Sequence, residues 1–99
     1  MVAKYLNRPA GVALLKKSDL ERKICTFYIF PDYRCKGVGA RLMADSISFL
    51  GEKRIGISVS DRNLGQLGPL IGSNGFKLDA KLEGFYRAGV SEFFFSRGI

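Results

Sequence analysis

Three stretches of the sequence carry a hydrophobic pattern that predicts a strand or a helix. Residues 24–30 are β-branched or aromatic almost throughout, which predicts a central strand buried on both faces. Residues 38–50 repeat apolar side chains at helical spacing, which predicts an amphipathic helix closed by Gly51. Apolar and small residues alternate over residues 55–60, as in a strand with one apolar face. Together they form one βαβ unit, whose two strands we expect to be parallel. The buried face of the helix is predicted to hold Val38, Leu42, Met43, Ile47, Phe49 and Leu50.

Four further strands are predicted from shorter patterns. Residues 2–6 are taken as an edge strand, and residues 11–15 form a short apolar strand bounded by Pro9. Residues 76–82 and 90–97 predict two strands joined by a loop, as a C-terminal hairpin. Because the last strand contains three consecutive phenylalanines, we expect it to be buried on both faces.

The segment between the βαβ unit and the hairpin is less regular. Residues 61–63 predict a turn, whose Asp61 or Asn63 is a candidate cap for a short helix over residues 64–73. The glycines and the proline within that stretch favour a bent or partly irregular segment. Gly75 is expected to end it with a left-handed backbone conformation.

Length and composition describe one compact domain spanning residues 1–99. Of the 99 residues, 46% are hydrophobic and 25% are charged, which is typical of a folded chain rather than a disordered one. No apolar run approaches the about 18 residues that cross a bilayer, and the N-terminus lacks the order of a signal peptide. We therefore expect a cytoplasmic protein without a membrane partner.

The composition limits which catalytic sites, metal sites and partners are possible. There is no histidine, and Cys25 and Cys35 show no metal-ligand spacing, so Ser-His, Cys-His and ordinary zinc sites are excluded and no metal is expected. We expect both thiols to be reduced, with Cys25 in the core and Cys35 exposed. The net charge of +7 favours an anionic partner, which leaves nucleic acid, membrane headgroups and a phosphorylated cofactor open. The basic residues form no run of five, so a nucleic-acid tail is not indicated.

A basic segment with two glycines joins the predicted strand at 24–30 to the predicted helix at 38–50. It reads Arg34-Cys35-Lys36-Gly37-Val38-Gly39-Ala40, with Arg41 next. The glycines allow positive φ angles or close approach of the backbone to a ligand, and the helix start adds unpaired N–H groups and the positive end of its dipole. This arrangement predicts a phosphate-binding loop, although a plain turn before a helix uses the same residue types.

The order of elements and this loop resemble the GNAT superfamily of N-acetyltransferases. The family signature is a strand, a Pro-acidic-Tyr turn and Arg/Gln-x-x-Gly-x-Gly/Ala opening a helix, which residues 29–40 match. An Asn after the next strand and a Gly-Phe ending the next helix form a second landmark, matched by Asn63 and by Gly75-Phe76. The resemblance covers residues 10–97. It implies a mixed α/β fold: a twisted sheet with antiparallel N-terminal strands, a parallel βαβ unit with splayed strands and a C-terminal hairpin.

The resemblance also implies acetyl-CoA as the cosubstrate. Backbone amides of the glycine loop would hold the pyrophosphate, and the pantetheine arm would run along the edge of the strand at residues 27–29. The N–H near Ile29 would stabilise the oxyanion that forms when an amine attacks the thioester, and Asn63 would contact the cofactor arm. The cofactor-binding residues implied in this way are Phe27, Tyr28, Ile29, Arg34, Cys35, Lys36, Gly37, Val38, Gly39, Ala40 and Asn63.

The candidates for catalytic side chains are fewer, because the sequence departs from the family's pattern. Members often carry an acid on one splayed strand and a Tyr on the next helix. Here residues 24–30 include no acid, Ser58 stands where some members carry Glu, and Ile71 stands at the position of the Tyr. The polar groups left to reach the gap are Tyr28, Ser58 and Ser60.

The N-terminal strand and helices with which members usually begin have no counterpart, since Val2 already lies near the family's second strand. We therefore expect a short form with an open acceptor site, completed by a homodimer or a partner subunit. The loop at 83–89, with Tyr86 or Arg87, is expected to border that site. The leading function is acetyl transfer from acetyl-CoA to a primary amine of a small molecule or protein. A non-catalytic CoA-binding module is the alternative, and a basic nucleic-acid-binding domain is the least favoured.

Overall fold

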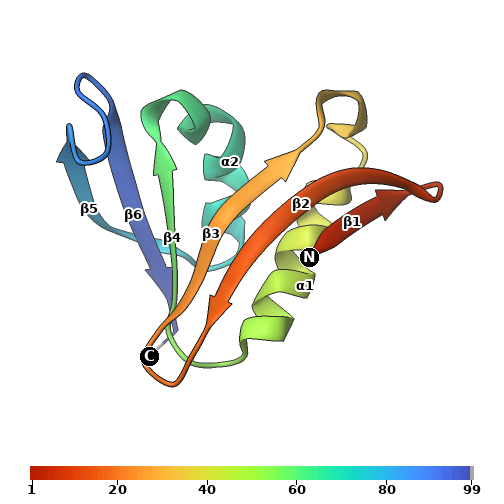
Figure 1. Cartoon of the computed structure of the whole chain (residues 1–99), viewed down its shortest axis with the longest axis horizontal. Coiled ribbons are helices and arrows are strands. Elements are labelled where there is room, and N and C mark those ends of the chain that lie inside the picture. Colours follow the sequence, from red (N-terminus) through yellow and green to blue (C-terminus); the bar gives the residue numbers. More distant parts are fainter. Residues whose placement is uncertain (99) are drawn as a thin grey trace.

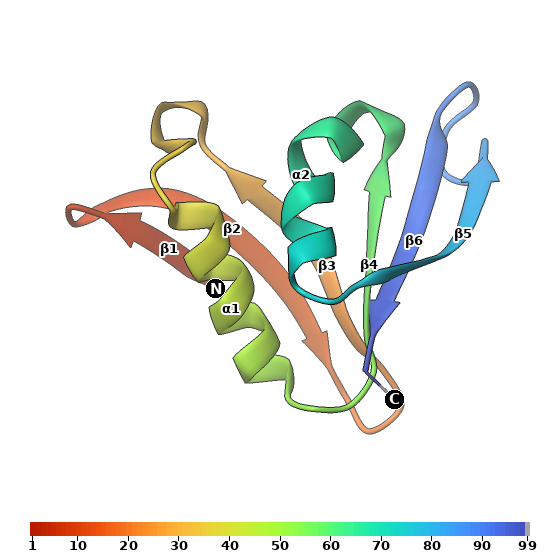
Figure 2. The ribbon, with the colours of Figure 1, turned by 180° about the vertical axis from the view of Figure 1, so that it is seen from behind.

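The computed structural model describes residues 1–98, which form a six-stranded mixed sheet with two helices on one face (Figure 1, Figure 2). The strand order is β1-β2-β3-β4-β6-β5, in which β3 and β4 are parallel and the other pairs are antiparallel. The mixed α/β fold, the βαβ unit and the C-terminal hairpin predicted from the sequence are confirmed. The elements are β1 (Val2–Tyr5), β2 (Arg8–Lys17), β3 (Arg22–Ile29), the short 3-10 helix η1 (Pro31–Tyr33), α1 (Val38–Leu50), β4 (Ile55–Ser60), α2 (Asp61–Ser73), β5 (Lys77–Glu83) and β6 (Ser91–Arg97).

The parallel strands β3 and β4 pair only at their N-terminal ends. Residues 23–24 of β3 pair with residues 56–57 of β4, and beyond this point the two strands diverge (Figure 1). At the same place β3 contains a bulge, because Cys25 has no partner residue in β2. A bulge bends its strand and increases the local twist. The predicted splay of the two strands is therefore confirmed.

The hydrophobic core lies between the two helices and the face of the sheet that they cover. Leu42 and Met43 of α1 and Ile71 of α2 are fully buried there. From the sheet, Ile57 and Val59 of β4 point into the same layer, as their alternation with small residues predicted.

The opposite face of the sheet carries no helix within residues 1–98 (Figure 1). The prediction that β3 is buried on both faces is therefore wrong, and so is the placement of Cys25 in the core, because Cys25 and Tyr28 are exposed. In β6, only Phe93 and Phe95 pack against the core, while the ring of Phe94 contacts a loop residue on the other face. A run of β-branched and aromatic residues predicts a strand, but it does not tell whether one face or both faces of that strand are covered.

The two helices differ in how closely they follow the prediction. α1 has the predicted bounds, but Phe49 is 52% exposed and its ring lies 5.1 Å from the Lys17 ammonium instead of in the core. α2 begins at Asp61, where a turn was predicted, and continues through Pro69 as one helix. Its buried Leu67 and Ile71 pack against the sheet, and such packing outweighs the poor helix propensity of its glycines.

Two local predictions concern glycine and proline. Gly75 has φ of 82° after α2, as expected for a left-handed helix end. Pro9 does not bound its strand, because β2 starts at Arg8. The β1–β2 register is irregular next to Pro9, and proline is tolerated in sheets at such bulges.

Candidate functional site

A cavity opens where β3 and β4 separate. Its volume is about 350 Å³, and residues of both strands, of α2 and of the β5–β6 connection line it. The predicted catalytic candidates Tyr28, Ser58 and Ser60 all line this one cavity, as does Asn63 from the first turn of α2. We call it the splay cavity.

The edge of β3 presents backbone groups to the splay. The N–H of Phe30 donates to the carbonyl oxygen of Ala10 at 2.8 Å, and hydrogen bonds to one neighbour alternate along an antiparallel strand. The backbone N–H and C=O groups of Phe27 and Ile29 therefore face away from β2, towards the side from which β4 has diverged. An extended chain bearing amides can pair with such groups as an added strand.

The glycine loop lies at the far end of β3. Cys35 and Gly37 have left-handed backbone conformations, with φ of 63° and 79°, and α1 starts at the next residue. No side chain caps this helix start, and the N–H of Arg41 is bonded to the carbonyl oxygen of Gly37 at 3.2 Å. The amides of residues 38–40 have no partner inside α1, which is the arrangement that binds anions.

Two smaller hollows connect the splay cavity with the loop. One, of about 30 Å³, is lined by Phe27, Asn63 and Gln66 among others, and the other, of about 240 Å³, by Arg34 and Gly39 among others. Leu67 of α2 lines both hollows and the splay cavity. The three spaces thus adjoin along the edge of β3, and we call them together the β3 track.

The basic residues predicted around the loop are divided between its two sides. Arg34 lies on the β3 track, where its Nε donates to the carbonyl oxygen of Ile29 at 3.1 Å. Lys36 and Arg41 instead line a separate cavity of about 490 Å³ between β1 and α1. The Lys36 ammonium lies 5.7 Å from the centroid of the Tyr5 ring. The three basic residues of this segment therefore do not gather at one place, and of the three only Arg34 faces the track.

Two polar residues that line the site, Gln66 and Glu92, were not identified in the sequence. Gln66 lines the β3 track, and Glu92 lines the splay cavity. Arg87, predicted only as a border of the acceptor site, lines the splay cavity as well. Glu92 reaches it because β6 pairs with β4, a register between distant segments that no local pattern in one sequence encodes.

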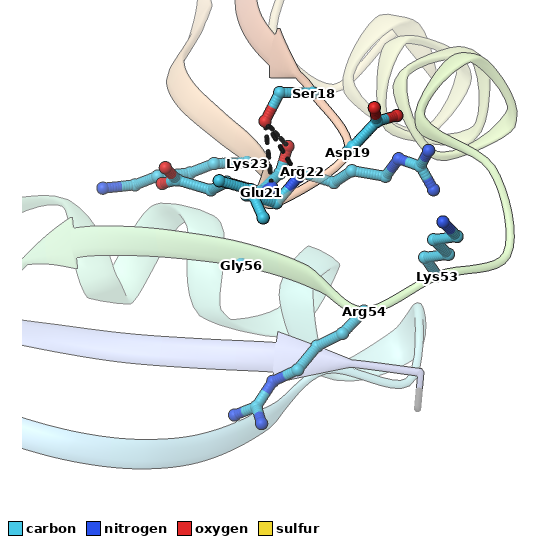
Figure 3. A pocket seen from close by; sticks show the side chains of 9 residues that line it. Ser18, Asp19, Glu21, Arg22, Lys23, Lys53, Arg54 and Gly56 are labelled. Carbon is cyan, nitrogen blue, oxygen red and sulfur yellow. Dashed lines mark hydrogen bonds between the residues drawn. The ribbon is translucent and has the colours of Figure 1, made fainter.

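A further basic cavity lies at the opposite end of the sheet, between the β2–β3 turn and the segment joining α1 to β4 (Figure 3). Its volume is about 380 Å³. Arg54 on its rim is already paired with Asp79 at 3.1 Å. Hydrogen bonding by Ser96, together with the bond and charge of Arg54, lowers the pKa of Asp79. The charged residues lining the cavity are Asp19, Glu21, Arg22, Lys23, Lys53 and Arg54. None of them belongs to the β3 track.

The described part of the chain contains neither a membrane-spanning helix nor a cluster of metal ligands. No helix within residues 1–98 is long and apolar enough to span a membrane. The same residues contain no group of three or more His, Cys, Asp or Glu side chains placed to hold a metal ion.

Solved acetyltransferase structures share this fold. A protein assigned as a streptothricin acetyltransferase from Bacillus anthracis, solved in complex with acetyl coenzyme A, has 20% identity and a TM-score of 0.84 over 99% of this chain and 61% of its own. The ribosomal-protein-alanine N-acetyltransferase from Brucella melitensis has 17% identity and a TM-score of 0.83 over 99% and 67%. The ribosomal-protein-S18-alanine N-acetyltransferase from Escherichia coli has 19% identity and a TM-score of 0.81 over 95% and 64%. The chain thus spans 61–67% of the length of these structures, and at such identities the likeness is one of fold.

The sequence itself matches one family model. No curated protein matches the sequence. The model described as the acetyltransferase (GNAT) family matches residues 1–67, a region that contains the splayed strands, the glycine loop and Asn63. Because this match covers more than half of the chain and agrees with the fold, the chain belongs to the GNAT family of acetyltransferases.

Proposed function

We propose that the protein transfers an acetyl group from acetyl-CoA to a primary amine. The observation that carries the proposal is the continuity of the β3 track, which runs from an uncapped helix start to the splay cavity. In this proposal the pyrophosphate lies on the amides of residues 35–40, and the pantetheine arm pairs with the backbone of Phe27 and Ile29. The thioester then reaches the small hollow that Ile29 lines and that adjoins the splay cavity. The related Bacillus anthracis structure, solved with acetyl coenzyme A, supports this choice of cosubstrate.

Acetyl transfer requires a hydrogen-bond donor to the developing oxyanion and an amine positioned to attack the thioester. The N–H of Ile29 donates to the thioester oxygen as the amine nitrogen attacks the carbonyl carbon, and one such donor typically contributes about 10²–10³ in rate. The new C–N bond forms, the C–S bond breaks, and coenzyme A leaves as a thiolate. Tyr28, Ser58 and Ser60 line the cavity, and in this proposal their hydroxyl groups position a water that relays protons.

A non-catalytic CoA-binding module is the second candidate. Ile71 occupies the position at which family members often carry a Tyr, and it is 0% exposed, so this part of α2 supplies no acid for the leaving thiolate. Under this reading the β3 track binds acetyl-CoA and transfers nothing.

Two measurements on one sample distinguish the candidates. Acetyl-CoA is titrated while the melting temperature is recorded, and release of free coenzyme A is followed with ethylamine, spermidine, glucosamine and a peptide bearing an N-terminal alanine. We expect the melting temperature to rise with ligand concentration by mass action and at least one amine to give turnover. Binding without turnover across the panel would favour the module. A melting temperature that does not respond to acetyl-CoA would reject both.

A further inference from the structure

The splay cavity contains a single carboxylate. Among the described residues that line it, Glu92 is the only acid. β3 has no acidic residue, and the lining residue of β4 at the family's acidic position is Ser58. The acetyl transfer proposed above, on which this inference rests, nevertheless requires that an amine lose protons.

The strand register turns Glu92 towards the face of the sheet that no helix covers. β6 runs antiparallel to β4, and Glu92 lies directly opposite Ser60. Residues opposite each other point to the same face, with Cβ atoms about 4.5–5.5 Å apart. Because Ile57 and Val59 of β4 are buried on the helix side, the alternating Ser58 and Ser60 point to the bare face, and Glu92 points with them. An acceptor approaching from that face meets Glu92.

The carboxylate of Glu92 is free to bind a ligand. Glu92 is half-buried, and none of the ion pairs within residues 1–98 includes it. The neighbouring acids are engaged elsewhere, since Glu83 lies 3.9 Å from the Lys81 ammonium and Asp61 accepts a bond from the N–H of Ser91 at 3.2 Å. The other ionisable groups lining the cavity are Cys25, Tyr28 and Arg87.

We propose that Glu92 is the general base of the transfer and that its acceptor is a protonated primary amine. The ammonium group donates a hydrogen bond to the Glu92 carboxylate, which takes one proton and passes it to solvent. The nitrogen lone pair then attacks the thioester carbon, the C–N bond forms and the C–S bond breaks. The second proton lost by nitrogen neutralises the coenzyme A thiolate. The products are the N-acetylated amine, free coenzyme A and one proton released to water.

The test compares Glu92→Gln with the matched control Glu52→Gln, an exposed acid in the segment that joins α1 to β4. Both variants are assayed with the amine of the panel that the wild type acetylates fastest, and the Kd of acetyl-CoA is measured for each. We expect E92Q to lower kcat/KM by about 10²–10⁴-fold near neutral pH with an unchanged Kd, and E52Q to resemble the wild type. Glu92→Asp should recover part of the loss.

The pH dependence separates a base from a structural role. Without Glu92 the enzyme depends on amine that is already neutral, and that fraction rises tenfold per pH unit below the pKa of the amine, which is about 10.4 for a lysine-like alkylamine and about 7.7–8.0 for a peptide N-terminus. The ratio of wild-type to E92Q activity should therefore shrink steadily as the pH rises from neutral. A ratio that is constant with pH, or below about threefold throughout, overturns the role of Glu92 and leaves acetyl transfer intact. A wild type that binds acetyl-CoA but acetylates no amine overturns both.

Discussion

Gly39 in the first turn of α1 packs against Ile29 at the end of β3, and a Cβ atom at position 39 would lie 3.6 Å from Cγ1 of Ile29. It would also lie 3.5 Å from Cδ2 of Leu70 in α2. Both are ordinary van der Waals distances, so there is room for one methyl group. The absence of a larger side chain keeps the backbone open to the β3 track, which Gly39 lines.

Substitutions at Gly39 should therefore distinguish the effect of side-chain size and charge on acetyl-CoA binding from an effect on folding. We expect Gly39→Ala to bind acetyl-CoA with nearly wild-type affinity. Gly39→Glu places a carboxylate beside the amides proposed to hold pyrophosphate, so it should abolish detectable binding by steric block and charge repulsion. Isothermal titration calorimetry measures the affinities, and the melting temperatures without ligand show whether both variants fold. Retained binding in G39E would place the pyrophosphate elsewhere.

A substitution at Gly37 tests instead whether the loop needs a left-handed backbone conformation at this residue. Its φ is 79°, and no atom lies within 4 Å of a Cβ built there, so any effect of Gly37→Ala comes from the backbone alone. A residue with a side chain costs about 1–2 kcal/mol in the left-handed region. We expect the free energy of unfolding, measured by urea denaturation, to fall by about that amount. A stability equal to the wild type would mean that the loop relaxes to another conformation.

The elements that the sequence predicted well are those whose signal is local. Helix α1 has both a helical hydrophobic period and a glycine at each end, and its bounds were predicted to the residue. α2 lacked such a signal, because its glycines and Pro69 contradict the helix that packing of Leu67 and Ile71 stabilises. Burial of a strand on one face or two is likewise decided by which helices cover the sheet, which explains the error at Cys25.

The site likewise has features that the sequence predicts and features that it does not. The glycine loop and Asn63 are recognisable from short motifs, and the structure places them along one track. The directions of Arg34 and Lys36, two residues apart, depend on which neighbour each side chain finds: a carbonyl of β3 for one and the Tyr5 ring for the other. The direction of such a side chain depends on its tertiary neighbours, which no local sequence pattern encodes.

Arg34 is expected to act by holding the loop against β3 as well as by charge. Its Nε donates to Ile29, and its guanidinium lies 5.6 Å from the centroid of the Tyr28 ring. Arg34→Lys keeps the charge and loses the Nε bond, while Arg34→Met loses both. Since a net hydrogen bond contributes about 0.5–1.5 kcal/mol, we expect R34K to weaken acetyl-CoA binding about 2–10-fold and R34M to weaken it further. Equal affinities in R34K and the wild type would assign Arg34 a purely electrostatic role.

The bare face of the sheet is the surface through which we expect two copies to associate. Leu14 of β2 and Leu82 of β5 point to this face and are 56% and 41% exposed. Apolar side chains on a sheet face that no helix covers are stabilised when an interface removes them from water. A second copy would remove both side chains from water and would complete one side of the open acceptor site. Light scattering at high micromolar concentration should then give twice the mass of 11.0 kDa.

The control for this interface is another exposed leucine. Leu20 is 98% exposed in the β2–β3 turn, at the far end of the sheet from the splay cavity. We expect Leu14→Glu and Leu82→Glu to shift the protein to monomer, because each would bury a carboxylate without a partner. Leu20→Glu should leave the dimer intact. A wild type that is monomeric at the same concentration would contradict the interface, and its acceptor site would then be open to solvent within a single chain.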